Sequence, residues 1–110
     1  MAEALKVNAV LTTLDISDNS IGLDGAKAFA EALRVNAVLT SLDLSGNCLC
    51  GLDMDGDGTY DGSGIKALAS ALEVNAVLKK CDVSYNRMDE DAKAVLREAV
   101  KGREGLELIL

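Results

Sequence analysis

The chain has 110 residues, 49% of them hydrophobic, and a formal net charge of −7. This length suits one domain with a modest core, and the negative charge argues against nucleic acid as a partner because phosphate backbones would be repelled. No apolar run approaches the roughly 20 residues that span a bilayer. The N-terminus also lacks the features of a secretory signal, so we expect neither a membrane nor export.

The residue types present also limit the chemistry. The chain has no His, three Cys and only three aromatic residues, two Tyr and one Phe. Without His it lacks the commonest general base and the commonest zinc ligand, so we expect no enzyme. An odd number of cysteines cannot pair fully within one chain, which favours a reducing, cytoplasmic setting. We interpret Cys48 and Cys50 as packing residues or adventitious thiols.

A repeated pentapeptide organises the whole chain. Val-Asn-Ala-Val-Leu occurs at residues 7–11, 35–39 and 74–78. From the last Leu of each copy runs the pattern LxxLxLxxNxL, in which the Leu positions also hold Ile16, Ile21, Cys81, Val83 and Met88. Leu11 and Leu39 are 28 residues apart, as are Leu78 and Leu106, whereas Leu39 and Leu78 are 39 apart. The second unit therefore carries an insertion of 39 − 28 = 11 residues.

The first half of each unit predicts a short strand that leads into a turn. In Leu14-Asp15-Ile16 the apolar residues alternate with a polar one, which places Leu14 and Ile16 inside and Asp15 outside. One such strand cannot bury its apolar face alone, so we expect the copies to stack as a parallel sheet. The Asn residues that follow should bond the backbone of the turn and of the neighbouring unit. They are Asn19, Asn47 and Asn86.

The second half of each unit predicts a helix, at about 24–36, 63–74 and 90–102. Asp24 and Ser63 are expected as N-caps, and Gly102 is expected to end the third helix. A strand followed by a helix in every unit predicts a right-handed β/α solenoid of class α/β, with the sheet on the concave side and the helices on the convex side. We expect residues 1–110 to form one domain of about three repeats with partial repeats at both ends.

The three copies in phase resemble the leucine-rich repeat family. The 28-residue period with a helical second half is similar to the ribonuclease-inhibitor-like and NOD-like-receptor-type repeats. The resemblance implies a protein-protein interaction scaffold with a protein partner. Both ends break off inside a repeat, so we expect a segment of a longer array or a homodimer through uncapped ends.

The outward positions of the strands form the candidate partner-binding surface on the concave side. Asp15, Asp43 and Asp82 should form an in-register column, which costs stability because like charges repel. The column is interpreted either as a strip for basic side chains of a partner or as a solubilising feature of the sheet. The candidate residues are Asp15, Ser17, Asp43, Ser45, Lys80, Asp82 and Tyr85.

The insertion, about residues 50–62, is rich in Asp and Gly. Asp53-x-Asp55-x-Asp57-Gly58 resembles the start of an EF-hand-like calcium loop, and Ca²⁺ prefers oxygen ligands around such a turn. The candidate ligands are Asp53, Asp55, Asp57, Thr59 and Asp61. Gly64 stands where such a loop has a bidentate Glu, and the alternative is a solvated connection. Apart from this Ca²⁺, no cofactor is expected.

Three functions remain open on the sequence. The leading hypothesis is the protein-interaction scaffold. The second is a calcium-responsive repeat module that acts through the loop at 53–61, and the third is a structural or engineered repeat fragment. A thermal melt with and without calcium distinguishes the second from the others.

Overall fold

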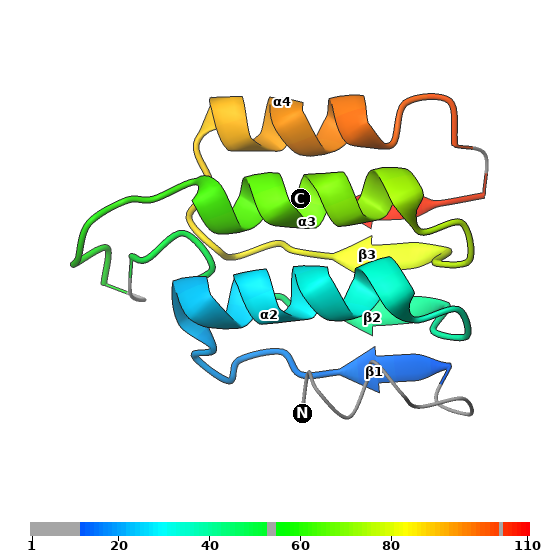
Figure 1. Ribbon diagram of the computed structural model, residues 1–110. Helices are drawn as coiled ribbons and strands as arrows, with labels where there is room; N and C mark the ends of the chain where they lie inside the picture. Colours follow the sequence, from blue (N-terminus) through cyan, green and yellow to red (C-terminus); the bar gives the residue numbers. More distant parts are fainter. Residues whose placement is uncertain (1–11, 53–54, 104) are drawn as a thin grey trace.

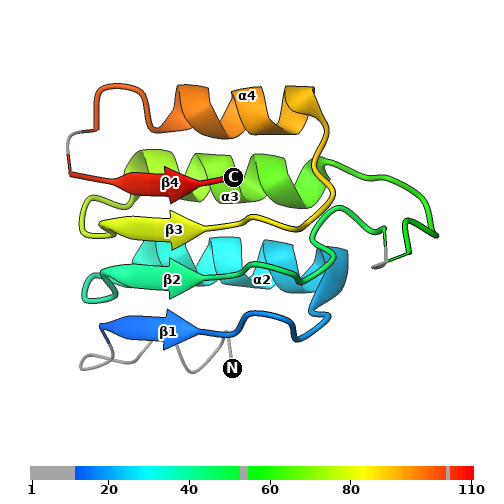
Figure 2. The ribbon, with the colours of Figure 1, turned by 180° about the vertical axis from the view of Figure 1, so that it is seen from behind.

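The structure is a computed structural model, and it describes residues 12–52, 55–103 and 105–110. Strands and helices alternate along this part of the chain. The elements are β1 (Thr13–Asp15), α2 (Gly22–Val35), β2 (Ser41–Asp43), α3 (Ser63–Val74), β3 (Lys80–Asp82), α4 (Glu90–Ala99) and β4 (Glu107–Ile109). The strands form one parallel sheet in the order β1-β2-β3-β4 (Figure 2), and all three labelled helices lie on one face of it (Figure 1). The predicted α/β solenoid is confirmed.

Each strand is three residues long and buries its middle residue. Leu14, Leu42 and Cys81 pair in register across β1, β2 and β3, and all three are buried. Cys81 thus fills a Leu position as predicted, and burial raises the pKa of its thiol to about 12. The residues on either side of these positions face away from the helices, so the sheet presents a row of polar side chains.

The predicted Asn ladder links neighbouring repeats. The Asn86 side chain accepts hydrogen bonds from the N–H groups of Asn47 at 2.8 Å and Leu49 at 3.2 Å. Its amide donates to the carbonyls of Leu44, Val83 and Ser84 at 2.8–3.0 Å. Because Asn86 is only 2% exposed, these bonds satisfy backbone groups that would otherwise be buried without partners.

A second ladder, which the sequence analysis did not identify, lies at the other end of the sheet. Asn75 is buried and accepts from the N–H groups of Val77 and Leu78, while its amide donates to the Leu33 carbonyl at 2.9 Å. Arg103 stands three residues before Leu106, as Asn75 does before Leu78, and its guanidinium donates to the Leu72 carbonyl at 3.1 Å. The sequence feature that could have predicted this second ladder is the Asn that recurs inside the otherwise apolar pentapeptide.

The core lies between the sheet and the helices and is almost entirely aliphatic. Small residues let α2 and α3 approach closely, since a Cβ on Gly64 would lie 2.9 Å from the Cβ of Ala26. Among the described residues, the fully buried apolar side chains larger than alanine and cysteine are Leu33, Leu39, Leu42, Leu44, Leu49, Ile65, Leu68, Leu72, Leu78, Val83 and Leu96. Stacked repeats thus cover one another's apolar faces.

The helix termini differ from the prediction in detail. Helix α2 starts at Gly22, so Asp24 lies in its first turn rather than at its cap. At α3 the cap position is Gly62, and the Asp61 carboxylate accepts from the Ser63 N–H at 2.8 Å. Helix α4 ends at Ala99, three residues before Gly102. The sequence pattern locates a helix but does not decide which of several adjacent polar residues binds the free N–H groups.

Candidate functional site

The acidic strip, by which we mean Asp15, Asp43 and Asp82, lies along the outward face of the sheet. Asp15 pairs with Asp43, and Asp43 with Asp82, in parallel register. Adjacent strands lie about 4.8 Å apart, so the three carboxylates follow one another across the sheet. Asp15 is exposed and the other two are half-buried. The strip is therefore accessible to a partner that carries positive charge.

Each Asp of the strip also holds the turn that follows its strand. The Asp43 carboxylate accepts from the N–H of Ser45 at 2.9 Å and from its hydroxyl at 2.7 Å. The same pair of bonds joins Asp15 to Ser17 and Asp82 to Ser84. These bonds hold the pKa of Asp15 below its usual value. The roles predicted for these Asp residues were only binding and solubility, although the spacing Asp-x-Ser occurs in all three repeats.

Lys80 and Tyr85 flank the strip on the third repeat. Lys80 is exposed and stands opposite Ser41 in the register of the sheet. Tyr85 is 83% exposed, and its backbone is left-handed with φ 57°. In the two preceding repeats this turn position holds Asp18 and Gly46, residue types that adopt positive φ more readily than Tyr does. An exposed aromatic side chain thus stands in the turn that follows β3, three residues after Asp82 of the acidic strip.

The insertion is closed at its base by backbone contacts. Leu52 and Gly58 form an antiparallel bridge, and the N–H of Asp61 donates to the Cys50 carbonyl at 2.8 Å. A Cβ on Gly58 would lie only 2.6 Å from the Gly51 carbonyl oxygen, so this close approach requires glycine. The two arms of the insertion therefore leave the repeat side by side.

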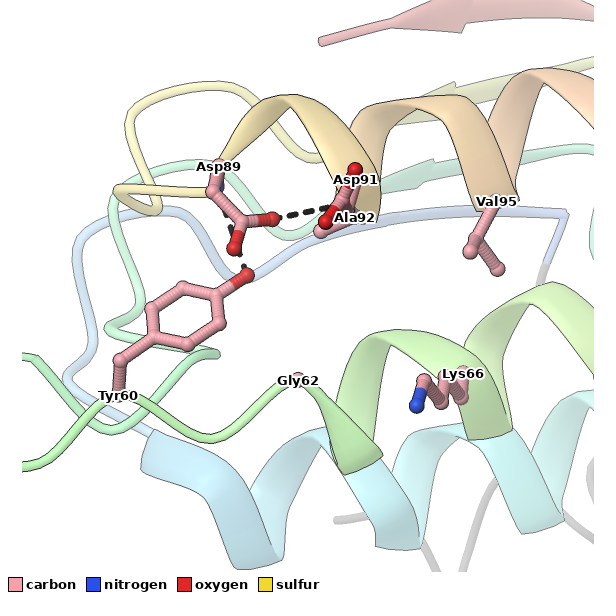
Figure 3. Close-up of a pocket in the computed structure, with 7 residues that line it drawn as sticks. All are labelled: Tyr60, Gly62, Lys66, Asp89, Asp91, Ala92 and Val95. Atoms are coloured by element: carbon pink, nitrogen blue, oxygen red, sulfur yellow. Dashed lines mark hydrogen bonds between the residues drawn. The ribbon is translucent and has the colours of Figure 1, made fainter.

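Tyr60 ties the returning arm of the insertion to the next repeat. Its hydroxyl accepts from the Asp89 N–H at 3.4 Å (Figure 3), and Asp89 in turn caps α4 by accepting from the Ala92 N–H at 2.8 Å. Burial raises the pKa of Tyr60. Cys50 is buried beneath this contact, and burial likewise raises the pKa of its thiol. The insertion is thus attached to the start of α4, in the next repeat.

The candidate calcium ligands are only partly described. Asp53 lies outside the described residues, whereas Asp55, Asp57, Thr59 and Asp61 are all exposed. Within the described part of the chain, no three Cys, Asp or Glu side chains gather closely enough to hold a metal ion. Asp61 is already bonded to the Ser63 N–H. Because Asp53 is the first ligand of the proposed loop, calcium binding stays a prediction.

Arg87 is a cation beside this loop that the sequence analysis overlooked. A Cβ on Gly56 would lie 3.3 Å from Nη1 of Arg87, so the guanidinium rests against the turn between Asp55 and Asp57. Arg87 follows the ladder residue Asn86 directly. The acidic insertion therefore lies against a positive charge from the third repeat.

The comparisons with known proteins agree with this architecture. A family described as Leucine Rich repeat matches residues 7–30 and 35–49. No curated protein sequence matches the chain. No helix in the described residues is long and apolar enough to cross a lipid bilayer.

The chain shares its fold with solved structures, among them the following two. The chain is similar to "Leiomodin-1 Actin-Binding Site 2 (ABS2)", with a TM-score of 0.78 and 24% identity over 98% of its length. It spans 57% of that leiomodin-1 chain. It also resembles the tropomodulin C-terminal domain of Caenorhabditis elegans, with a TM-score of 0.52 and 10% identity, over 98% of this chain and 78% of that one. The chain therefore contains a leucine-rich repeat segment and has a leucine-rich-repeat-like fold.

Proposed function

We propose that this chain is a protein-interaction module that binds its partner through the strand side of the sheet. The observation that carries the proposal is the in-register acidic strip, with an exposed Tyr85 in the turn three residues after Asp82. Tyrosine is enriched among residues that dominate binding energy, and complementary charge speeds association. A partner with basic side chains, spaced to reach successive strands, fits this surface.

Actin is the first partner to test. The leiomodin-1 structure with the same fold is by its title an actin-binding site, and it aligns with 98% of this chain. An interaction role also agrees with the composition, because a chain without His lacks the commonest general base. We further propose that the module acts without catalysis.

The test compares two charge-removing double variants in binding to monomeric actin and to actin filaments. Asp43→Asn/Asp82→Asn removes two charges from the strip, while the Asn oxygens can still accept the bonds from Ser45 and Ser84. Asp24→Asn/Glu31→Gln removes two charges from the exposed surface of α2. We expect the strip variant to bind about tenfold more weakly and the control to bind like the unmodified chain.

A second variant tests the aromatic anchor. Tyr85→Gly removes the ring but suits the positive φ, so the fold should be as stable as before or more stable. Binding should nevertheless weaken, by roughly tenfold or more if Tyr85 is central to the contact. Failure of the unmodified chain to bind actin would remove actin as the partner. Equal binding by the strip variant and its control would remove the strip as the binding surface.

A further inference from the structure

On the opposite side of the molecule, a groove separates α3 from α4. Two hollows of about 210 Å³ and about 590 Å³ share Lys66 and Val95 and so continue one another along the two helices. The first is bounded by Tyr60 of the insertion (Figure 3), which places the insertion at one end of the groove. The α2–α3 contact differs, because Gly64 there lies directly against Ala26.

The floor of the groove is made of small and apolar side chains. Ala69 of α3 and Ala92 of α4 are buried, and Val95 and Ala99 are half-buried. Small residues on both helices leave a shallow channel rather than an interlocked contact. α3 has 12 residues, so at about 1.5 Å per residue the channel offers roughly 18 Å of length. Such a channel suits the apolar stripe of a helix.

The groove is lined by four carboxylates, two at each end, and by the exposed Lys66 where the two hollows meet. Asp89 and Asp91 lie at its first end, and Glu73 and Glu98 line its second hollow. Glu73 and Glu98 stand in the last turns of α3 and α4, where the helix dipole disfavours an anion. Within the described residues, neither carboxylate takes part in an ion pair or hydrogen bond. A cation held near both would offset this unfavourable placement.

We propose that the α3–α4 groove binds an amphipathic helical segment of a partner protein, with apolar residues in the channel and Lys or Arg at both ends. The cationic ends lie against Asp89 and Asp91 at one end and against Glu73 and Glu98 at the other. This site lies on the helix side of the sheet, so it is distinct from the acidic strip and does not depend on it.

The probe is a synthetic amphipathic peptide of roughly 12–14 residues, matched to the length of α3. It carries Leu at helical spacing on one face and Lys at both ends, and a matched peptide carries Glu in place of Lys. We expect the Lys peptide to bind, with an affinity that falls as salt is raised, and the Glu peptide to bind at least about tenfold more weakly. Amide shifts in NMR spectra should change along α3 and α4.

Two variants with one matched control locate the binding. Glu98→Lys should weaken binding of the Lys peptide about fivefold. It should not destabilise α4, because a cation near a helix C-terminus interacts favourably with the helix dipole. Glu31 stands 20 residues after Leu11 as Glu98 does after Leu78, so Glu31→Lys makes the same change at the equivalent position outside the groove. The control should bind normally. Ala94→Trp, at an exposed position on the groove, should block the channel and weaken binding about tenfold.

Three results would overturn the proposal. The first is equal binding of the Lys and Glu peptides. The second is a set of amide shift changes confined to the strands, which would assign the peptide to the acidic strip. The third is a doubled mass in light scattering that Ala94→Trp abolishes, which would make a second copy of this chain the occupant of the groove.

Discussion

The two contacts between neighbouring helices differ although the same repeat builds both. At the α2–α3 contact, Gly64 lies against Ala26 and the helices are closely packed. At the α3–α4 contact, small side chains line a groove that Tyr60 of the insertion bounds at one end. The repeat pattern thus fixes the sheet and the core, whereas residues outside the pattern decide whether the outer surface is closed or open.

The Asn ladder joins each repeat to the next, so it supports both helix contacts. Removing it should cause the largest loss in the free energy of unfolding. Asn86→Ala leaves three carbonyls and two N–H groups without their side-chain partner in the buried corner of the sheet. Each buried unsatisfied group costs about 1–3 kcal/mol, so we expect a loss of about 3 kcal/mol or more in the free energy of unfolding. Urea denaturation measures it.

Asn19→Ala supplies the matched control for this prediction. Asn19 holds the same repeat position, but it is exposed and its amide donates to the carbonyls of Ile16 and Ser17. Water can replace those bonds, so the loss should stay near or below about 1 kcal/mol. Equal losses for the two variants would show that burial of the ladder does not matter.

Calcium bound by the loop at 53–61 should stabilise the insertion, which bounds the groove at the α3–α4 contact. A ligand at a hundred times its Kd stabilises the folded state by about 2.7 kcal/mol, so millimolar Ca²⁺ should raise the melting temperature. Asp57→Asn should reduce this shift, and Mg²⁺ at the same concentration should give less of it. A melt that calcium leaves unchanged would remove the calcium-responsive function.

Gly64→Ala tests the closed contact. The added Cβ would lie 2.9 Å from the Ala26 Cβ and 3.0 Å from Leu23 Cδ1, so the helices must separate. Overpacking costs about 1–3 kcal/mol, and the better helix propensity of Ala returns up to about 1, so we expect a net loss of about 1–2 kcal/mol. Gly62→Ala, with its nearest contact 3.7 Å away, should cost less. A stabilised Gly64→Ala protein would contradict the close packing.

The smallest effect is expected at Asp15, on the outer strand away from both contacts. Hydrogen bonds from Ser17 lower the pKa of Asp15 in the folded state. Its contribution to stability is therefore present above its unfolded pKa of about 3.9 and is lost as the pH falls through the lower folded pKa. Asp15→Asn should flatten the dependence of unfolding free energy on pH below about 4. An unchanged slope would show that the turn does not depend on the charged form.

The sequence predicted the features that recur in every repeat. The strand positions, the buried Cys81 and the ladder through Asn47 and Asn86 all follow from a pattern that recurs in phase. The helix bounds were predicted less accurately, because several polar residues can accept from the first free N–H groups.

The candidate site was predicted less completely than the fold. The acidic strip follows from alternation along the strands, but its bonds to Ser17, Ser45 and Ser84 were not anticipated. The groove could not be predicted, because it depends on the distance between two helices rather than on any local pattern. The approach of Arg87 to Gly56 likewise joins parts of the chain that no periodicity relates.

The most direct test of the account is a hydrogen-exchange footprint of the chain with and without a bound actin partner. The acidic strip and Tyr85 predict slower exchange in the backbone from Asp43 to Asn47 and from Asp82 to Arg87, with α2 unchanged. Protection confined to the helices, with the strand side exchanging as in the free chain, would contradict the proposed binding surface.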